Sequence, residues 1–251
     1  MVRPFFFAWH FLTAIPLNRT HHDPTPRELA FSMRLYPLIG LMLGGLLAIS
    51  DILLSGLFSR GVVNALLIVL LVAVTRGLHQ DGLADSLDGL AGGQTPEQRL
   101  EIMRDGRIGA IGATGLALAL GLRYAGFSAM PEMERVPVLV CMPAIGRWAM
   151  VLGALSGPYA RTGGGLAEPF LTQLSWRDVL WATGLLAAAL LFLLGPLGAL
   201  VSVGIAALIA RVLATVSNRF IGGITGDTLG ATNEMAEVIF LLASPVLLSW
   251  R

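Results

Sequence analysis

An acidic segment, residues 79–93, carries the side chains in this sequence that are best suited to chemistry. Its sequence, HQDGLADSLDGLAGG, places carboxylates at Asp81, Asp85 and Asp88. In a helix these positions are i, i+4 and i+7, so the three side chains project from one face. Stacked carboxylates repel one another unless a cation lies among them, and oxygen ligands suit a hard divalent ion. We therefore predict that they bind Mg2+, with Mn2+ as a substitute; a solvated acidic loop is the alternative.

A second acidic pair follows a helix break at Gly92-Gly93. Pro96 is typical of the first position of a helix and predicts a short helix over residues 96–104. Glu101 and Asp105 then stand at i and i+4, on one face. We predict that this pair completes the ion cluster, with Asp105 as a further metal ligand.

Two arginines, Arg104 and Arg107, precede the apolar run that begins at Ile108. A helix N-terminus presents amide groups and the positive end of its dipole to anions, so a phosphate site is expected here. Anchoring of the following helix at the membrane surface explains the two arginines equally well.

A glycine-rich polar segment, residues 218–234, is a second candidate for binding. Its sequence, NRFIGGITGDTLGATNE, holds four glycines and several hydroxyl groups, and such backbones can wrap N–H groups around a ligand. We predict that its polar side chains bind substrate or a metal-bound water, and a flexible turn is the alternative. The predicted binding residues are Thr225, Asp227, Asn233 and Glu234.

Two further residues are candidates for substrate binding. His79 lies two residues before Asp81 and shares the acidic site. Arg147 lies inside an apolar run, where a charge is costly and marks a functional candidate by default. We predict that Arg147 pairs with a carboxylate or with a substrate phosphate inside the helix bundle.

The composition defines the class of protein. Of 251 residues, 55% are hydrophobic and 13% are charged, which is typical of an integral membrane protein. The net charge of +1 gives no indication of nucleic-acid binding, and the single Cys141 excludes a disulfide framework. We expect one all-α domain, residues 1–251, built as a polytopic membrane helix bundle.

Seven apolar segments are long enough, or nearly so, to cross a bilayer. The Phe-rich residues 1–16 are too short to cross and are expected to lie at the interface or to re-enter. Gly40 and Gly44 form a small-xxx-small pattern, which is typical of closely packed helices. The second span is short, and we expect its helix to continue past Arg76. The spans are 35–58, 61–76, 108–130, 136–156, 179–195, 197–216 and 233–250.

The arginines give an orientation to this arrangement. Seven crossings place the N-terminal segment and the loops 76–107, 157–178 and 217–232 on one side. That side holds eleven arginines, and the other side holds three. By the positive-inside rule, the acidic segment faces the cytoplasm.

Three stretches resemble the cobalamin-5′-phosphate synthase family, the adenosylcobinamide-GDP ribazoletransferases. They are residues 75–90, 101–109 and 222–231, and the N-terminal segment that ends in LTAIP resembles the family too. The resemblance implies a multi-pass enzyme of the bacterial cytoplasmic (inner) membrane that uses Mg2+. Its implied partners are adenosylcobinamide-GDP, alpha-ribazole or its phosphate and the lipid bilayer, with no nucleic acid; a homo-oligomer stays open.

A more distant resemblance is to the CDP-alcohol phosphotransferases, whose motif begins D-x2-D-G-x2-A-R. Residues 85–91 fit the start of this first half, but a glycine stands in place of the Arg. The second half, G-x3-D-x3-D, is absent as written, although Glu101 and Asp105 reproduce its acidic spacing. A phospholipid-headgroup transferase is therefore one alternative, and an ion-coupled transporter is another from a different class.

The resemblance implies a phosphoryl-type transfer. A ribose hydroxyl of alpha-ribazole attacks the phosphorus that bears the cobinamide arm, GMP leaves, and metal ions grip the pyrophosphate. We predict Asp105, Glu101 and Asp88 as the catalytic carboxylates, with Asp105 or Glu101 as the acceptor of the hydroxyl proton.

Overall fold

The structure is a computed structural model that describes residues 2–17, 24–165 and 167–248, and within these ranges it is helical with no strand. Short 3-10 turns at Met33–Leu35 and Glu132–Glu134 connect some of the helices. The helices are α1 (Val2–Leu12), α2 (Pro26–Ser32), α3 (Tyr36–Ser55), α4 (Arg60–Thr75), α5 (Leu78–Gly92), α6 (Pro96–Ile102), α7 (Ala110–Ala129), α8 (Arg135–Ala154), α9 (Glu168–Thr172), α10 (Trp176–Ile221) and α11 (Gly226–Leu248).

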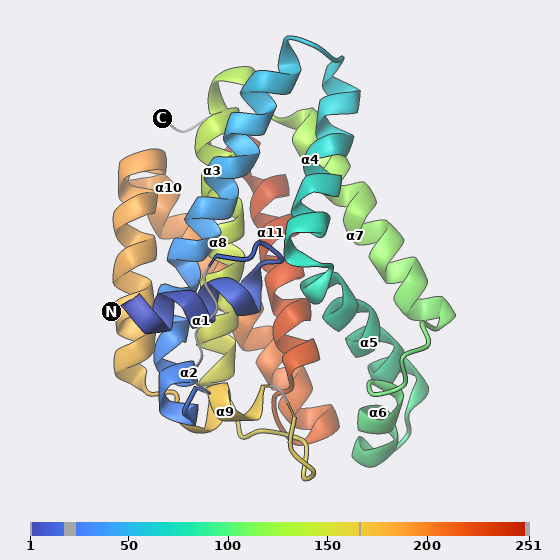
Figure 1. The fold of residues 1–251 in the computed structure, drawn as a ribbon. Coiled ribbons are helices and arrows are strands. Elements are labelled where there is room, and N and C mark those ends of the chain that lie inside the picture. The colour runs from blue at the N-terminus through green and yellow to red at the C-terminus, as the bar shows by residue number, and fades with distance from the viewer. Residues whose placement is uncertain (1, 18–23, 166, 249–251) are drawn as a thin grey trace.

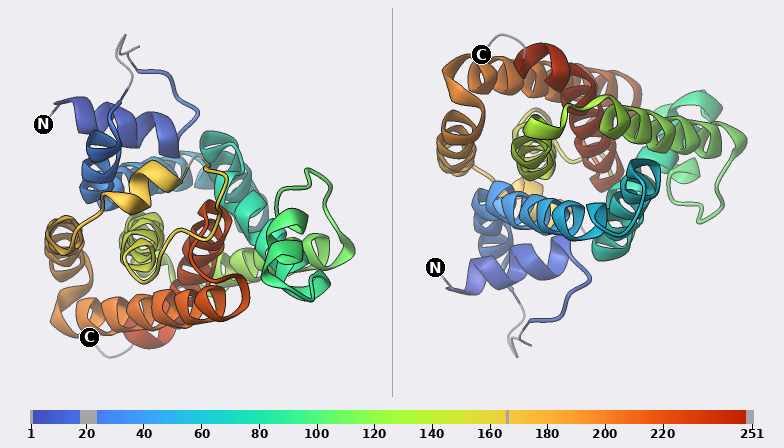
Figure 2. Two further views of the ribbon diagram at one scale, coloured as in Figure 1. Left: turned by 90° about the horizontal axis from the view of Figure 1, so that it is seen from below. Right: turned by 90° about the horizontal axis from the view of Figure 1, so that it is seen from above.

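The most central helix is α8, which packs against α3, α10 and α11 and is surrounded by the other helices in Figure 2. Glycines set the distance between α3 and α8. A Cβ at Gly40 would lie 2.4 Å from the Cα of Ala144, and one at Gly44 would lie 2.3 Å from the carbonyl oxygen of Val140. The predicted close packing through Gly40 and Gly44 is therefore confirmed.

Four helical segments are long and apolar enough to cross a membrane: Pro26–Ser55, Ala110–Ala129, Glu132–Ala154 and Trp176–Ile221. The pair α4 and α5 qualifies only together, bent by 88°, which gives up to five within the described residues. The prediction of an all-α polytopic membrane protein is confirmed in this form, but the number of seven spans is not.

Two features of the structure explain why it has fewer candidate spans than the seven predicted. The predicted spans 179–195 and 197–216 are halves of the single 46-residue α10, which is interrupted at Gly195 (φ 73°) before Pro196; a glycine tolerates this backbone, and a proline cannot continue the helical hydrogen bonds. Figure 2 shows the two halves running in different directions. The predicted span 233–250 is most of α11, whose polar first turns lower its hydropathy; residues 249 and 250 lie outside the described residues.

The helix of α4 ends at Arg76, where we expected it to continue. Arg76 (φ 56°) and Gly77 (φ 65°) both adopt left-handed backbone conformations, so the chain turns sharply into α5. The guanidinium of Arg76 donates to the carbonyl oxygens of His10 and Thr13 at 3.2 and 3.3 Å. These bonds hold the end of α1 at the break, and α1 lies across α3 in Figure 1 rather than along it.

Candidate active site

The acidic helix α5 packs directly against α11, and two glycines set how closely. A Cβ at Gly82 would lie 2.8 Å from the carbonyl oxygen of Asp227, and one at Gly230 would lie 3.2 Å from the Cα of Gly82. Any larger side chain at either position would push the two helices apart. The contact brings Asp227 of α11 to the side of α5 that carries Asp81 and Asp85.

These three carboxylates influence one another. Helix α5 by itself is too polar to count as a membrane-spanning segment, because it carries three aspartates within eight residues. The pKa of Asp85 is raised to about 7, first by partial burial and then by the negative charges of Asp81, Asp227 and Asp88. Arg161, from the segment between α8 and α9, offsets part of this charge by donating to Asp227 Oδ2 at 2.5 Å.

Asp81 and Asp85 line a cavity of about 770 Å³, together with Arg76, Arg104 and Asp105. This volume lies in the usual range for a small-molecule site, about 300–1,000 Å³. A neighbouring hollow of about 580 Å³ is lined by Glu101 and also by Arg104 and Asp105. The structure thus brings Asp81, Asp85, Arg104 and Asp105 to one cavity and places Glu101 beside it.

Asp88 has a different environment from the other two aspartates of α5. Its Oδ2 accepts the amide of Gly109 at 2.7 Å, and its Oδ1 accepts the amide of Gly112 at 2.8 Å. Both amides belong to the first turn of α7, whose N–H groups have no partner within the helix. Asp88 therefore caps α7 from a neighbouring helix, and this geometry does not group it with Asp81 and Asp85 as a metal ligand or a catalytic group.

We expect the Asp88→Ala variant to lose about 1–2 kcal/mol of unfolding free energy, as other helix caps do. Asp88→Asn keeps one acceptor oxygen and should lose less. Thermal unfolding in detergent measures both values. An Asp88→Ala variant with an unchanged melting temperature but weakened Mn2+ binding would instead support the predicted ligand role.

The second predicted pair is also arranged differently from expectation. Asp105 forms an exposed ion pair with Arg107, with Nη2 at 2.5 Å and Nε at 3.0 Å from its carboxylate. The hydrogen bond from Arg107 lowers the pKa of Asp105, which weakens it as a proton acceptor. Glu101 is exposed on α6.

The described residues contain no group of three His, Cys, Asp or Glu side chains that could hold a metal ion. The predicted set of Asp81, Asp85, Asp88 and Asp105 is divided because Asp88 caps α7 and Asp105 pairs with Arg107. Mg2+ is usually held by one or two carboxylates, several waters and substrate phosphates. Asp81 and Asp85 fit this smaller requirement, and the interaction of their like charges favours binding of a cation.

Behind the acidic face lies a buried polar network of two arginines and two glutamates. Arg123 Nη2 lies 2.8 Å from Glu234 Oε2 and 2.9 Å from Glu237 Oε2, and Arg147 pairs with Glu237. All four side chains are at most 2% exposed. Their charges cancel, so the network offers no free positive charge to a substrate phosphate.

Neutral side chains extend this network to α5. The Nη2 atom of Arg147 lies 3.3 Å from His79 Nδ1, and Gln80 donates to Glu234 Oε1 at 3.1 Å. Asn233 donates to Glu234 at 3.3 Å and to Glu237 at 3.1 Å. The predicted binding residues His79, Arg147, Asn233 and Glu234 therefore lie together in the core, where they tie the start of α5 to α7, α8 and α11.

The remaining predicted residue, Thr225, lies at the start of α11. Its hydroxyl accepts the amide of Thr228 at 3.2 Å and lies 3.3 Å from Asp227 Oδ2. Thr225 thus caps α11 and orients Asp227 toward α5. The predicted site did not include Arg161, because no motif marks the segment in which it lies; Arg123 and Glu237 were detectable as charges within apolar runs.

An all-helical membrane bundle with paired aspartates and arginines on a polar cavity is typical of a membrane enzyme that acts on a phosphate-bearing substrate. The chain belongs to the cobalamin-5-phosphate synthase family, whose model matches residues 4–244. This confirms the family predicted from the three motifs.

Curated relatives cover nearly the whole chain. A protein from Syntrophobacter fumaroxidans is 42% identical over 94% of this chain and 96% of its own length. One from Desulforamulus reducens is 38% identical over 94% of each chain, and one from Desulfitobacterium hafniense is 36% identical over 97% and 96%. All three are named adenosylcobinamide-GDP ribazoletransferase. No solved structure matches the chain.

Proposed function

We propose that this chain is a Mg2+-dependent adenosylcobinamide-GDP ribazoletransferase whose metal site is built on Asp81 and Asp85. The family match and the names of the relatives confirm the transferase activity in cobalamin synthesis. The metal dependence and the residue roles are our extension. The observation that carries them is the pair of aspartates that lines the 770 Å³ cavity beside Arg104 and Asp105.

Different residues of the cavity bind the metal ion and the substrate phosphate. Asp81 and Asp85 would hold the ion, which when bound supplies charge to neutralise the pyrophosphate of adenosylcobinamide-GDP. Arg104, which lines the same cavity, binds a phosphate oxygen. The Arg161 and Asp227 pair, at 2.5 Å, limits the negative charge around Asp85 and so keeps the cavity able to accept an anionic substrate.

We propose Asp105 as the base that accepts the proton of the attacking ribose hydroxyl, with Glu101 as the alternative. In the present arrangement Arg107 holds the Asp105 pKa low. A substrate phosphate that draws Arg107 away would release Asp105 and bring its pKa back toward its ordinary value. The base would thereby become effective only when substrate is bound.

The proposed placement is a single domain in the bacterial cytoplasmic membrane, with seven crossings and the cavity facing the cytoplasm. The break of α10 at Gly195 supports two crossings by its two halves. With α3, α4, α7, α8 and α11 this gives seven. The excess of arginines on the side of the acidic segment supports the orientation.

Turnover assays with purified protein test this function. Adenosylcobinamide-GDP and alpha-ribazole phosphate should give GMP and a cobalamin product in Mg2+ or Mn2+, and excess EDTA should stop the reaction. CDP-diacylglycerol with an alcohol acceptor is the control for a phospholipid-headgroup transferase. Turnover of the lipid substrate alone would overturn the proposed activity, and undiminished corrinoid turnover in EDTA would overturn the metal.

A further inference from the structure

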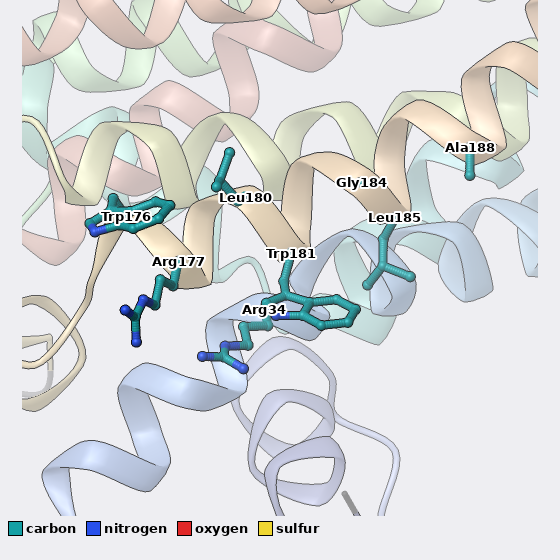
Figure 3. Close-up of a pocket in the computed structure, with 8 residues that line it drawn as sticks. All are labelled: Arg34, Trp176, Arg177, Leu180, Trp181, Gly184, Leu185 and Ala188. Carbon is teal, nitrogen blue, oxygen red and sulfur yellow. The ribbon is translucent and has the colours of Figure 1, made fainter.

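A second hollow lies where α10 begins, beside the 3-10 turn between α2 and α3. Its volume is about 610 Å³, and its lining includes Arg34, Arg177, Trp181 and Gly184. Figure 3 shows the side chains of Arg34 and Arg177 extending into the same space below α10, with Trp181 next to Arg34. None of the described residues that line this hollow is acidic.

A narrow apolar groove adjoins the hollow. It has a volume of about 300 Å³ and shares Arg34, Trp181 and Leu185 with the hollow. Its other lining residues are apolar and come from α1, α2 and the start of α3: Phe5, Phe31, Leu35 and Leu38. The two spaces together form a site with a basic end and an apolar end.

The basic end has more positive charge than its one carboxylate can balance. Asp178 is completely buried, and it accepts Arg34 Nε at 2.5 Å and Arg27 Nη1 at 3.3 Å. Arg177 lies over the ring of Trp176, 5.6 Å from its centre, and makes no ion pair within the described part of the chain. One carboxylate, Asp178, thus pairs with two arginines, and the guanidinium of Arg177, which has no ion pair among the described residues, can bind an anion.

The surroundings place this site at the edge of the bilayer. It lies on α10, an apolar helix able to cross a membrane. Trp176 and Trp181 are 59% and 62% exposed, and tryptophans on a membrane helix gather at the level of the lipid headgroups. A basic pocket of this kind beside membrane helices favours an anionic headgroup.

We propose that this site binds one molecule of an anionic phospholipid. The phosphate lies between Arg34 and Arg177, and an acyl chain follows the groove past Phe31, Leu38 and Leu185. The bound lipid bridges α10 to α1 and α2, so it stabilises the bundle. A free phosphate ion would use the arginines but not the groove. The inference depends on the placement of the chain in a membrane and not on the transferase reaction.

Two substitutions test the hollow, one by its charge and one by its volume. Arg177→Gln removes the unpaired cation and leaves the Asp178 pairs intact. Gly184→Leu fills the hollow without a charge change, because a Cβ at Gly184 meets no atom within 4 Å. Arg211→Gln is the matched control, since Arg211 is exposed on the same helix but does not line the hollow.

The experiment compares nanodiscs of phosphatidylcholine with nanodiscs that also contain phosphatidylglycerol. We expect phosphatidylglycerol to raise the melting temperature of the wild type and of Arg211→Gln. Loss of one arginine contact should weaken lipid binding about fivefold, so this shift should fall by about 2–4 °C in Arg177→Gln. Gly184→Leu should also lose the rise in melting temperature that phosphatidylglycerol causes. Native mass spectrometry should show one phosphatidylglycerol retained on the wild type and on Arg211→Gln only.

Three results would overturn the proposal. Equal phosphatidylglycerol shifts in Arg177→Gln and Arg211→Gln would mean a general surface-charge effect. An undiminished shift in Gly184→Leu would exclude a lipid headgroup in the hollow. Equal stabilisation by inorganic phosphate in pure phosphatidylcholine would show a free-anion site instead of a lipid site.

Discussion

The Asp85→Asn variant should remain folded and lose at least about 10³-fold in turnover. A metal ion contributes several kcal/mol of charge stabilisation to the transition state, and each 1.36 kcal/mol corresponds to about tenfold in rate. Asp81→Asn should have the same effect, because Asp81 and Asp85 hold the ion together in the proposed site. GMP release from adenosylcobinamide-GDP measures both losses.

The thermal stability of the metal-free protein provides a second test of the role of Asp85. Its folded-state pKa, about 7, lies above the ordinary aspartate value of 3.8, so the folded state holds the proton more tightly than the unfolded chain. The stability contributed by the protonated form is present below about 4 and is lost as the pH rises to about 7. In EDTA at pH 8, Asp85→Asn should therefore unfold no lower than the wild type. Mg2+ should raise the melting temperature of the wild type but not that of Asp85→Asn.

Asp105→Asn is the matched control for a carboxylate of the same cavity. Its Arg107 pair is exposed, and exposed pairs contribute little to stability. This variant should keep the Mg2+-dependent rise in melting temperature even if its turnover falls. Near-normal turnover of both Asp81→Asn and Asp85→Asn at limiting Mg2+ would refute the metal assignment.

The Glu237→Gln variant should lose about 3–5 kcal/mol of unfolding free energy. The substitution leaves Arg123 and Arg147 buried with one glutamate, and an uncompensated buried charge costs this much. The double variant Glu237→Gln with Arg147→Met removes the surplus charge and should recover part of the loss. Thermal unfolding in detergent compares the wild type, the single variant and the double variant.

A surface pair provides the control for this prediction. Glu132 pairs with Arg60, and its side chain is 61% exposed, so Glu132→Gln should cost less than about 1 kcal/mol. If Glu237→Gln unfolds like the wild type but binds GDP more tightly, Arg147 contacts substrate phosphate, as we predicted from sequence. The buried, charge-balanced pairing of Arg147 favours the structural role.

Local patterns in the sequence identified features whose causes are themselves local. Gly40 and Gly44 mark a close contact because small residues four positions apart let two helix backbones approach each other. The short helix after Gly93 begins as predicted, with Thr95 accepting the amide of Gln98 at 3.3 Å. Asp81 and Asp85 share a helix face because they are four residues apart.

Features that depend on distant partners could not be derived in this way. Asp88 follows the same spacing as Asp81 and Asp85, but its amide partners lie 21 and 24 residues further along the chain. Arg161 reaches Asp227 across 66 residues. The end of α4 was missed because Arg76 takes a left-handed conformation, which is uncommon for a residue with a side chain.

The cap that Asp88 forms on α7 also constrains how the protein can move. Two backbone bonds fasten α5 to the first turn of α7, while the glycine contact holds the other side of α5 against α11. The acidic helix cannot swing outward alone without breaking one of these attachments. Any widening of the cavity to admit a corrinoid must therefore carry α7 along with α5, or arise elsewhere in its lining, such as at the segment that carries Arg104 and Asp105.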